Sequence, residues 1–287
     1  MKQLNLFIEL IRLKKPIGFM LLFWPCAWGL TLAYDFSDNL NDYFLYISLF
    51  FLGAVLMRSA GCIVNDIFDK EFDKKVSRTK ERPIAAEKIS IKLGLIYVTI
   101  LCFLALFVLL KFNTLTIILA LSSMPLAFTY PLMKRYTYWP QLFLGITFNY
   151  GLILGWVCIK DQVSIIPIIL YLGAIFWTLG FDTIYGYQDI KDDEIIGIKS
   201  TSIKFKKNPK LFLIICYLIF TMSLVTVGFF MEFNIIFYLF ISITALHLFF
   251  NQINNFNFRN PKNSLKIFKS NNLLGLIVLL NILVGKV

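Results

Sequence analysis

The chain has 287 residues, of which 58% are hydrophobic and only 16% are charged, a balance far too apolar for an ordinary soluble domain. Its net charge of +11 could suit a nucleic-acid-binding protein, but the basic residues are spread over the connections between long apolar runs. These runs do not alternate as barrel strands do. We therefore expect an all-α integral membrane protein with no nucleic-acid partner.

The predicted elements begin with residues 1–16, which combine an apolar helical face with basic residues and predict an interfacial N-terminal arm in contact with membrane lipid. Nine apolar runs follow, each near the roughly 20 residues that a spanning helix needs. They predict a bundle of nine transmembrane helices, at 17–34, 43–64, 92–110, 113–132, 138–158, 163–185, 209–230, 233–252 and 271–285. No linker interrupts them, so residues 1–287 are expected to form a single intramembrane domain.

The distribution of Lys and Arg predicts the orientation of this multi-pass protein. Of 28 basic residues, 24 lie in the N-terminal arm and in alternate connections, whereas the opposite connections contain only Lys111, Lys160 and Lys286. The positive-inside rule then places the N-terminus in the cytoplasm and the C-terminus outside. Because no Arg- and Ser-rich, acid-poor presequence precedes the first run, we expect a bacterial inner membrane.

Acidic side chains recur with one spacing at the ends of two predicted helices. In "NDIFDKEFD" (65–73), Asp66, Asp69 and Asp73 fall within about 60° of one another on a helix, and Asn65 can join that face. In the later stretch "DTIYGYQDIKDDE", the same kind of face carries Asp182, Tyr185, Asp189 and Asp193. Since the second and sixth helices carry equivalent stripes, we expect an internal repeat.

Carboxylates grouped in this way need a cation, because like charges on one face repel each other. Magnesium typically binds one or two carboxylates and completes its shell with water and phosphate oxygens. Arg78 and Arg82 follow the first stripe and Lys199 follows the second, and such bases suit a diphosphate. The pattern favours ionisation of a diphosphate whose apolar tail lies among the helices. Solvated helix ends are the simpler interpretation of any single one of these acids.

At these residues the chain resembles the UbiA family of intramembrane aromatic prenyltransferases. The first family motif, N-D-x-x-D-x-x-x-D, is present as "NDIFDKEFD", and the second, D-x-x-x-D, as "DIKDD". The similarity extends through "KPIGFMLLFWPCAWGL", "YPLMKRYTYWPQLFLG" and "GIKSTSIKF" and covers essentially the whole chain. Within the family it is greatest to the branch that prenylates 4-hydroxybenzoate in the ubiquinone pathway.

The resemblance implies a UbiA-type bundle that uses Mg²⁺ to transfer a polyprenyl group from polyprenyl diphosphate to 4-hydroxybenzoate. No obligate protein partner is evident from the sequence. The site residues that it implies are the catalytic set Asp66, Asp69, Asp73, Asp182, Asp189 and Asp193, the metal ligands Asn65, Asp69, Asp189 and Asp193, the diphosphate partners Arg78, Arg82 and Lys199, and the acceptor contacts Arg135 and Tyr185. The ring proton would go to Asp182, to Asp189 or to the released diphosphate.

Two alternatives stay open at this point. A sister enzyme of the family would use a naphthoate, homogentisate or haem acceptor with the same motifs. An ion-coupled transporter would also use repeats and intramembrane acids, although here the acids lie at helix ends beside phosphate-type bases. Arg58, inside the second predicted helix, needs a polar or anionic partner in either case.

Overall fold

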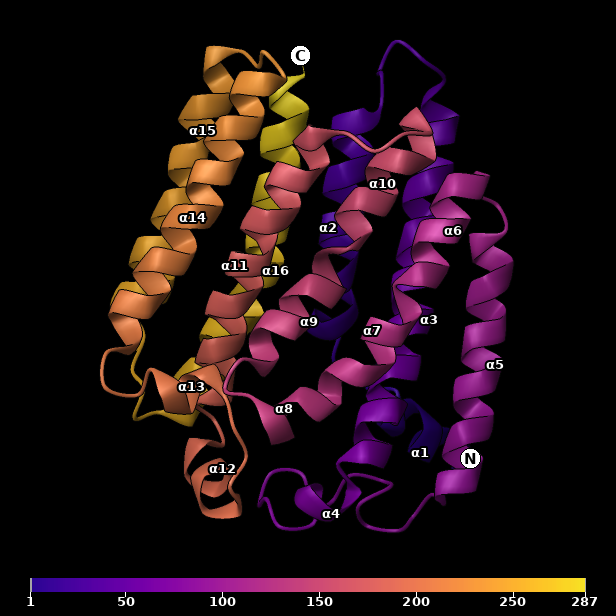
Figure 1. Ribbon diagram of the computed structural model, residues 1–287, viewed down its shortest axis with the longest axis vertical. Coiled ribbons are helices and arrows are strands. Elements are labelled where there is room, and N and C mark those ends of the chain that lie inside the picture. Colours follow the sequence, from indigo (N-terminus) through magenta and orange to yellow (C-terminus); the bar gives the residue numbers. More distant parts are fainter. Residues whose placement is uncertain (1, 287) are drawn as a thin grey trace.

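The computed structural model describes residues 2–286, which form a helical bundle with no β-strand in that range (Figure 1). Within this part of the chain, 8 helices are long and apolar enough to cross a membrane, and α2 is a shorter apolar helix beside them. The shorter helix is α2 (Ile17–Ala33). In chain order the 8 long helices are α3 (Leu40–Phe68), α5 (Ile91–Leu109), α6–α8 (Thr114–Tyr136), α9–α10 (Pro140–Lys160), α11 (Ile165–Gly186), α14 (Pro209–Phe230), α15 with its continuation (Ile235–Asn254) and α16 (Pro261–Gly285). The predicted all-α bundle is confirmed.

Some spans are composite, and short helices gather at one end of the bundle. The composite spans divide into α6 (Thr114–Ser122), α7 (Met124–Thr129), a 3₁₀ turn (Tyr130–Leu132) and α8 (Met133–Tyr136); α9 (Pro140–Asn149) and α10 (Gly151–Lys160); and α15 (Ile235–Leu246) with a π-helical segment (His247–Asn254). The short helices are α1 (Lys2–Leu10), α4 (Lys70–Asp73), α12 (Ile190–Ile196) and α13 (Thr201–Lys204). In Figure 1 they lie at the lower end, opposite the C-terminus.

The last span starts at Pro261 rather than at the predicted 271, and its cap explains the difference. The side chain of Asn260 accepts from the backbone N–H groups of Lys262 and Asn263, and Pro261 occupies the first helical position. Both features favour helix initiation. The prediction placed the start too late because the first turns of α16 contain lysines and are not apolar.

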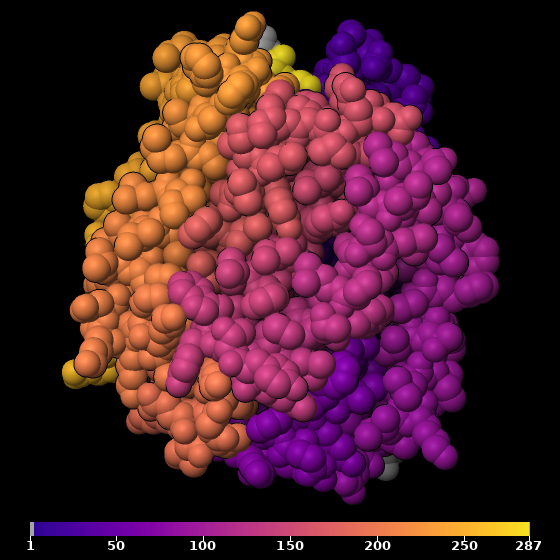
Figure 2. All heavy atoms as spheres, in the orientation of Figure 1, coloured from indigo at the N-terminus to yellow at the C-terminus, as the bar shows by residue number. Residues whose placement is uncertain are grey.

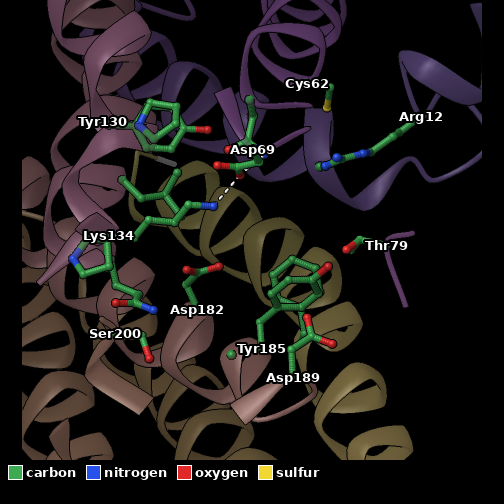
Figure 3. A pocket seen from close by; sticks show the side chains of 18 of the residues that line it. Arg12, Cys62, Asp69, Thr79, Tyr130, Lys134, Asp182, Tyr185, Asp189 and Ser200 are labelled. Carbon is green, nitrogen blue, oxygen red and sulfur yellow. Dashed lines mark hydrogen bonds and ion pairs between the residues drawn. The ribbon is translucent and has the colours of Figure 1, made fainter. Parts of the chain in front are cut away.

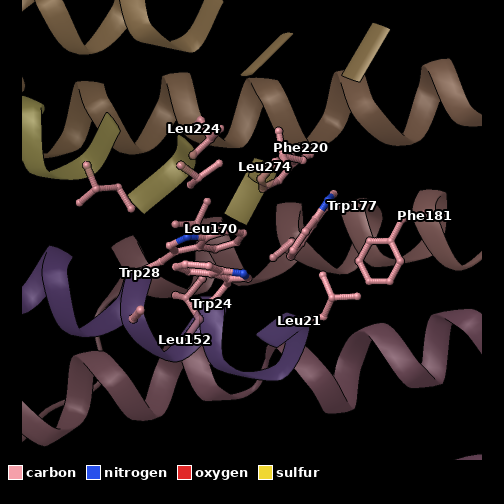
Figure 4. Packing of buried hydrophobic residues seen from close by; sticks show 14 of the residues in the cluster. Leu21, Trp24, Trp28, Leu152, Leu170, Trp177, Phe181, Phe220, Leu224 and Leu274 are labelled. Atoms are coloured by element: carbon pink, nitrogen blue, oxygen red, sulfur yellow. The ribbon is translucent and has the colours of Figure 1, made fainter. Parts of the chain in front are cut away.

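The core is centred on α2, which packs between α10 and α16. Trp28 of α2 lies 5.1 Å, centroid to centroid, from Trp177 of α11 and 6.1 Å from Phe220 of α14 (Figure 4). Glycines let α2 and α10 approach closely: a Cβ on Gly29 would lie 1.9 Å from the carbonyl oxygen of Leu152. Small residues at such contacts are typical of helix pairs in membranes.

The outward faces of the bundle are apolar, and α5 shows this most clearly. Only 11% of its spanning window is buried inside the protein, while Leu95, Ile96 and Phe103 are more than half exposed, at 51%, 54% and 58%. Apolar surface of this extent on a soluble monomer would be unusual. A bilayer covers it, and the chain is a multi-pass integral membrane protein.

Candidate active site

Both acidic motifs lie where a spanning helix breaks into a short helix. Helix α3 ends at Phe68, and α4 follows Asp69, whose backbone has φ −94° and ψ 1°. Helix α11 ends at Gly186, and Asp189, with φ −117° and ψ 8°, directly precedes α12. Asp69 lies in the sparsely populated bridge region of backbone space, where active-site residues are often found, and Asp189 lies close to it. The expectation that each stripe follows one continuous helix is wrong, because the chain turns at these two residues.

The two breaks border one cavity of about 320 Å³ at this end of the bundle (Figure 3). The predicted site residues that line it are Asn65, Asp69, Asp73, Arg78, Arg82, Asp182, Tyr185, Asp189, Asp193 and Lys199. Asp66 is not part of the lining but contacts two arginines that are, Arg12 and Arg82. The fold therefore brings together acids and bases that are more than 100 residues apart in the sequence.

Arg135, the predicted acceptor contact, lies outside this lining. Its Nη2 donates to the carbonyl oxygen of Phe68 at 2.6 Å, and its guanidinium lies 5.2 Å from the ring centroid of Phe72. The preceding residue, Lys134, lines the cavity instead. Lys134 lies one helical turn after Tyr130, which also lines the cavity, and this spacing is the signal that could have distinguished the two adjacent bases.

Two carboxylates of the first motif are buried and compensated by arginines. Asp66 is 1% exposed, and its Oδ1 accepts from Arg12 at 2.5 Å and from Arg82 at 3.2 Å. Arg82 also donates to Asp73 at 2.8 Å. Burial raises the pKa of Asp73 above its ordinary value, although the nearby Arg82 opposes the shift. Since Arg12 follows α1, these ion pairs tie the N-terminal arm to the motif.

Asp69 has one oxygen engaged and one free. Its Oδ2 forms an ion pair with Lys134 and accepts from the Asn65 amide at 3.0 Å (Figure 3). Its Oδ1 is buried and has no hydrogen-bond partner among the described residues. A buried polar atom without a partner costs free energy. This oxygen is therefore a natural point of attachment for a cation.

A hard divalent cation fits this donor set if a ligand contributes further oxygens. No three His, Cys, Asp or Glu side chains within residues 2–286 are grouped closely enough to hold a metal ion alone. The oxygen donors of Asp69, Asp189 and Asp193 nevertheless line the same cavity. Mg²⁺ commonly binds in this way, through one or two carboxylates together with substrate phosphate oxygens.

The second motif is held by Arg78, which comes from the connection between α4 and α5. The guanidinium donates to both carboxylate oxygens of Asp189, at 2.5–2.9 Å, and to the hydroxyl of Tyr185 at 3.3 Å. Arg78 thus bridges the two halves of the site. Burial raises the pKa of Asp193 to about 6, and the neighbouring Asp189 adds to the shift.

The inner wall of the cavity carries an arginine with a free donor. Arg58 lies 5.2 Å from the ring centroid of Phe148, and its buried Nε has no hydrogen-bond partner in the described part of the chain. Asp182 also lines the cavity and projects between Lys134 and Tyr185 in Figure 3. A buried guanidinium beside a cavity can bind a carboxylate with charge-assisted hydrogen bonds.

Sequence reasoning missed several residues of this lining. Arg12, Thr79, Tyr130 and Ser200 all border the cavity. Arg12 belongs to the predicted interfacial arm, and no local pattern separates it from the neighbouring bases. Its positive φ of 55° turns the chain between α1 and α2, so that the side chain reaches Asp66.

Comparison with known proteins identifies the family. A family model described as "UbiA prenyltransferase family" matches residues 22–275. This chain belongs to the UbiA prenyltransferase family. Membership confirms the resemblance carried by the two acidic motifs, and it favours a prenyl-transferring enzyme over a transporter.

Relatives with closely similar sequences carry one name. The chain is 43% identical over 287 residues to the *Bos taurus* protein named 4-hydroxybenzoate polyprenyltransferase, mitochondrial, covering 99% of this chain and 76% of the relative. The *Homo sapiens* protein of the same name is 42% identical, with 99% and 76% coverage. The *Drosophila melanogaster* protein is 40% identical over 280 residues, with 97% and 71% coverage.

Solved structures of UbiA homologues share the fold. A UbiA homologue from *Aeropyrum pernix* K1 superposes with a TM-score of 0.76 at 23% identity, over 94% of this chain and 99% of the homologue. A UbiA homologue from *Archaeoglobus fulgidus*, described as bound to GPP and Mg²⁺, has a TM-score of 0.68 at 18% identity, with 98% coverage of both chains. At these identities the likeness establishes the architecture of the UbiA-type bundle.

Proposed function

We propose that this protein transfers a polyprenyl group from polyprenyl diphosphate to the ring carbon next to the phenol of 4-hydroxybenzoate, releasing diphosphate, as a step of ubiquinone biosynthesis. One observation carries the proposal: the polar cavity shares Arg58, Tyr130 and Phe148 with an apolar cavity of about 410 Å³. A charged head and a long apolar tail on one donor molecule match such a pair of cavities. The names of the relatives support 4-hydroxybenzoate as the acceptor.

The polar cavity would bind the diphosphate and its metal. Asn65, Asp69, Asp189 and Asp193 would hold Mg²⁺, which, when bound, neutralises negative charge developing on the diphosphate. The bases of the lining that could contact the phosphate oxygens include Arg12, Arg78, Arg82, Lys134 and Lys199. Positive groups fixed in advance around a departing anion stabilise the transition state without reorganisation.

The reaction would start with breakage of the bond between the prenyl C1 atom and the diphosphate oxygen. The electron pair leaves with the diphosphate, and the allylic carbocation remains at the mouth of the apolar cavity. Apolar walls exclude water from the cation, and the rings of Tyr130 and Phe148 can stabilise it by cation–π attraction. The acceptor carbon next to the phenol then forms the new carbon–carbon bond.

Asp182 is the best-placed base for the ring proton that is lost after this step. It lines the cavity, and among the described residues no ion pair involves its carboxylate. Asp189, the alternative, accepts from Arg78 on both oxygens, so its carboxylate is already engaged and less accessible to the ring proton. Proton transfer to Asp182 restores the aromatic ring and completes the balance of atoms and charge.

Arg58, rather than Arg135, is the group that we assign to the acceptor carboxylate. It borders both cavities, and its unpartnered Nε is available for an anionic ligand. This position would hold the acceptor ring next to the carbocation, with the phenol directed toward Tyr185 and the diphosphate site. The free donor on a buried side chain supports the assignment.

We further propose that the site faces the cytoplasm in a bacterial inner membrane, or the corresponding inner face of a mitochondrion, since the named relatives are mitochondrial. The basic residues concentrated at the end with the motifs support this orientation. We also propose that residues 1–287 form one domain, because α1 packs on α3 and α5. Thiol labelling of Lys80→Cys and Lys111→Cys in sealed vesicles checks the orientation; equal labelling of both would contradict it.

The test of function is transfer of a labelled polyprenyl group in membranes that contain this protein. We expect product with 4-hydroxybenzoate and Mg²⁺, loss of product with a chelator, and little product with naphthoate or homogentisate. If product formed only with another acceptor, the proposed prenyl-transfer reaction would stand, but the assignment of 4-hydroxybenzoate as the acceptor would be wrong. No transfer to any acceptor by folded protein would overturn the proposed function.

A further inference from the structure

The apolar cavity extends into the bundle from the mouth at Arg58. Its walls come from α2, α3, α5, α6, α7, α9 and α10, and they are almost entirely apolar. In Figure 2 the surface is hollowed at mid-height between the segments of α6–α7 and α9–α10. The apolar cavity therefore adjoins the head-group site at the residues that line both, Arg58, Tyr130 and Phe148.

One face of α3 runs from the polar cavity into the apolar one. Asn65 lines the polar cavity, and Gly61, Met57 and Gly53 line the apolar cavity at successive steps of four residues. Four residues are slightly more than one helical turn, so each position follows the last at about 6 Å along the axis and is turned by only about 40° around it. Gly61, Met57 and Gly53 therefore lie at increasing distances from the diphosphate site along α3.

The two glycines of this face differ from the packing glycines of the bundle. A Cβ on Gly29 or Gly155 would lie within 2.3 Å of backbone atoms, so helix packing requires those glycines. A Cβ on Gly53 or Gly61 would have no atom within 4 Å. Glycine inside a helix costs about 1 kcal/mol relative to alanine. Packing does not account for this cost at either position, whereas an open cavity does.

We propose that Gly61, Met57 and Gly53 form the wall that sets the length of prenyl tail accepted by the enzyme. The proposal rests on the proposed function, because the occupant is the donor tail. Gly61, one turn from the diphosphate site, borders the first part of the tail. Gly53, two turns farther along α3, borders only the part that longer donors reach.

The experiment measures kcat/KM with a series of prenyl diphosphates of increasing length for the wild type, Gly61→Leu and Gly53→Leu. Each leucine should lower the ratio of long-donor to short-donor kcat/KM by about tenfold or more, because it fills tail space. The loss should begin at a shorter donor in Gly61→Leu than in Gly53→Leu. A merely structural role would not produce this order.

Two controls separate cavity filling from general damage. Leu52→Phe adds bulk to the same helix at a side chain that is 47% exposed on the outer surface, and it should leave the length profile unchanged. Thermal stability and binding of inorganic diphosphate with Mg²⁺ show that each variant is folded and that its head-group site is intact. Gly61→Ala and Gly53→Ala provide milder variants if a leucine prevents folding.

The outcomes distinguish this inference from the proposed function. If the wild type transfers no prenyl group, the function itself fails. If the wild type is active but either leucine variant keeps the wild-type length profile, or loses all donors equally, the assignment of this wall is overturned. Cutoffs in the same order as the positions along α3 would support it.

Discussion

The two acidic motifs occupy equivalent breaks in α3–α4 and α11–α12, but their carboxylates are compensated differently. In the first motif the aspartates are 1–6% exposed, and each is paired with a cation from another segment. In the second motif the side chain of Asp189 is 15% exposed and paired with Arg78 alone. No ion pair within residues 2–286 involves Asp182 or Asp193.

This difference indicates that an acidic motif can perform two tasks: it can hold the site in place within the fold, or it can bind ligands. Buried ion pairs that connect the arm, α3 and the connection after α4 hold the first motif in place, and removing one partner of such a pair is costly. The second motif lies beside the short helix α12, where Ile195 is 85% exposed. We infer that the ion pairs of Asp66 and Asp73 fix the first motif within the fold and leave only one oxygen of Asp69 for a ligand, whereas in the second motif Asp182 and Asp193 have no paired cation among the described residues.

The largest expected effect is on activity, and both motifs should show it. Asp69→Asn and Asp189→Asn should each lower prenyl transfer about 100- to 1,000-fold, because each removes charge that holds the metal and diphosphate. Initial rates with saturating donor check this. Asp192→Asn, a neighbouring acid outside the cavity lining, is the matched control for Asp189 and should retain most activity. If Asp192→Asn lost all prenyl-transfer activity, the effect of Asp189→Asn could not be attributed to the position of Asp189 in the cavity lining.

The next effect is on stability and should distinguish the motifs. Asp66→Asn leaves Arg12 and Arg82 without the carboxylate between them, and should lower the free energy of unfolding by about 3 kcal/mol. Asp189→Asn should cost clearly less, because its carboxylate is more exposed and pairs with one arginine. Unfolding of both variants in the same detergent gives the comparison. Equal losses would show that the second motif is as firmly built into the fold as the first.

The two motifs also show which features could be predicted from the sequence: local ones could, and contacts between distant segments could not. The spans follow from local length and apolarity, and the acids follow from local spacing, so both are visible in a single chain. The pairing of Arg12 with Asp66 depends on how α1 packs on α3, which no local pattern records. The breaks at Asp69 and Asp189 contain no proline that would mark them locally, and both residues pair with cations from distant segments.

A smaller effect tests whether Lys134 leaves Asp69 and contacts the diphosphate when Mg²⁺ and diphosphate bind. Lys134 pairs with Asp69, so Lys134→Met should free that carboxylate and weaken binding of diphosphate, by about tenfold if one charge-assisted contact is lost. Calorimetry with Mg²⁺ alone, with diphosphate alone and with both separates the affinity for the metal from the affinity for diphosphate. The wild type should bind the pair more tightly than the separate affinities predict. Independent binding of metal and diphosphate would argue against an exchange of partners.

The smallest effect concerns Arg135, which touches the first motif without entering the cavity. Its exposed guanidinium donates to the carbonyl of Phe68 at the end of α3, so Arg135→Met should cost at most about 1 kcal/mol of stability. The KM for 4-hydroxybenzoate should stay within about threefold of the wild type, whereas Arg58→Met should raise it at least tenfold, because a charge-assisted contact to the carboxylate is lost. Steady-state kinetics with varied acceptor compares the two. If Arg135→Met raises this KM and Arg58→Met does not, the acceptor carboxylate binds near α8, and the cation predicted from the sequence is the correct one.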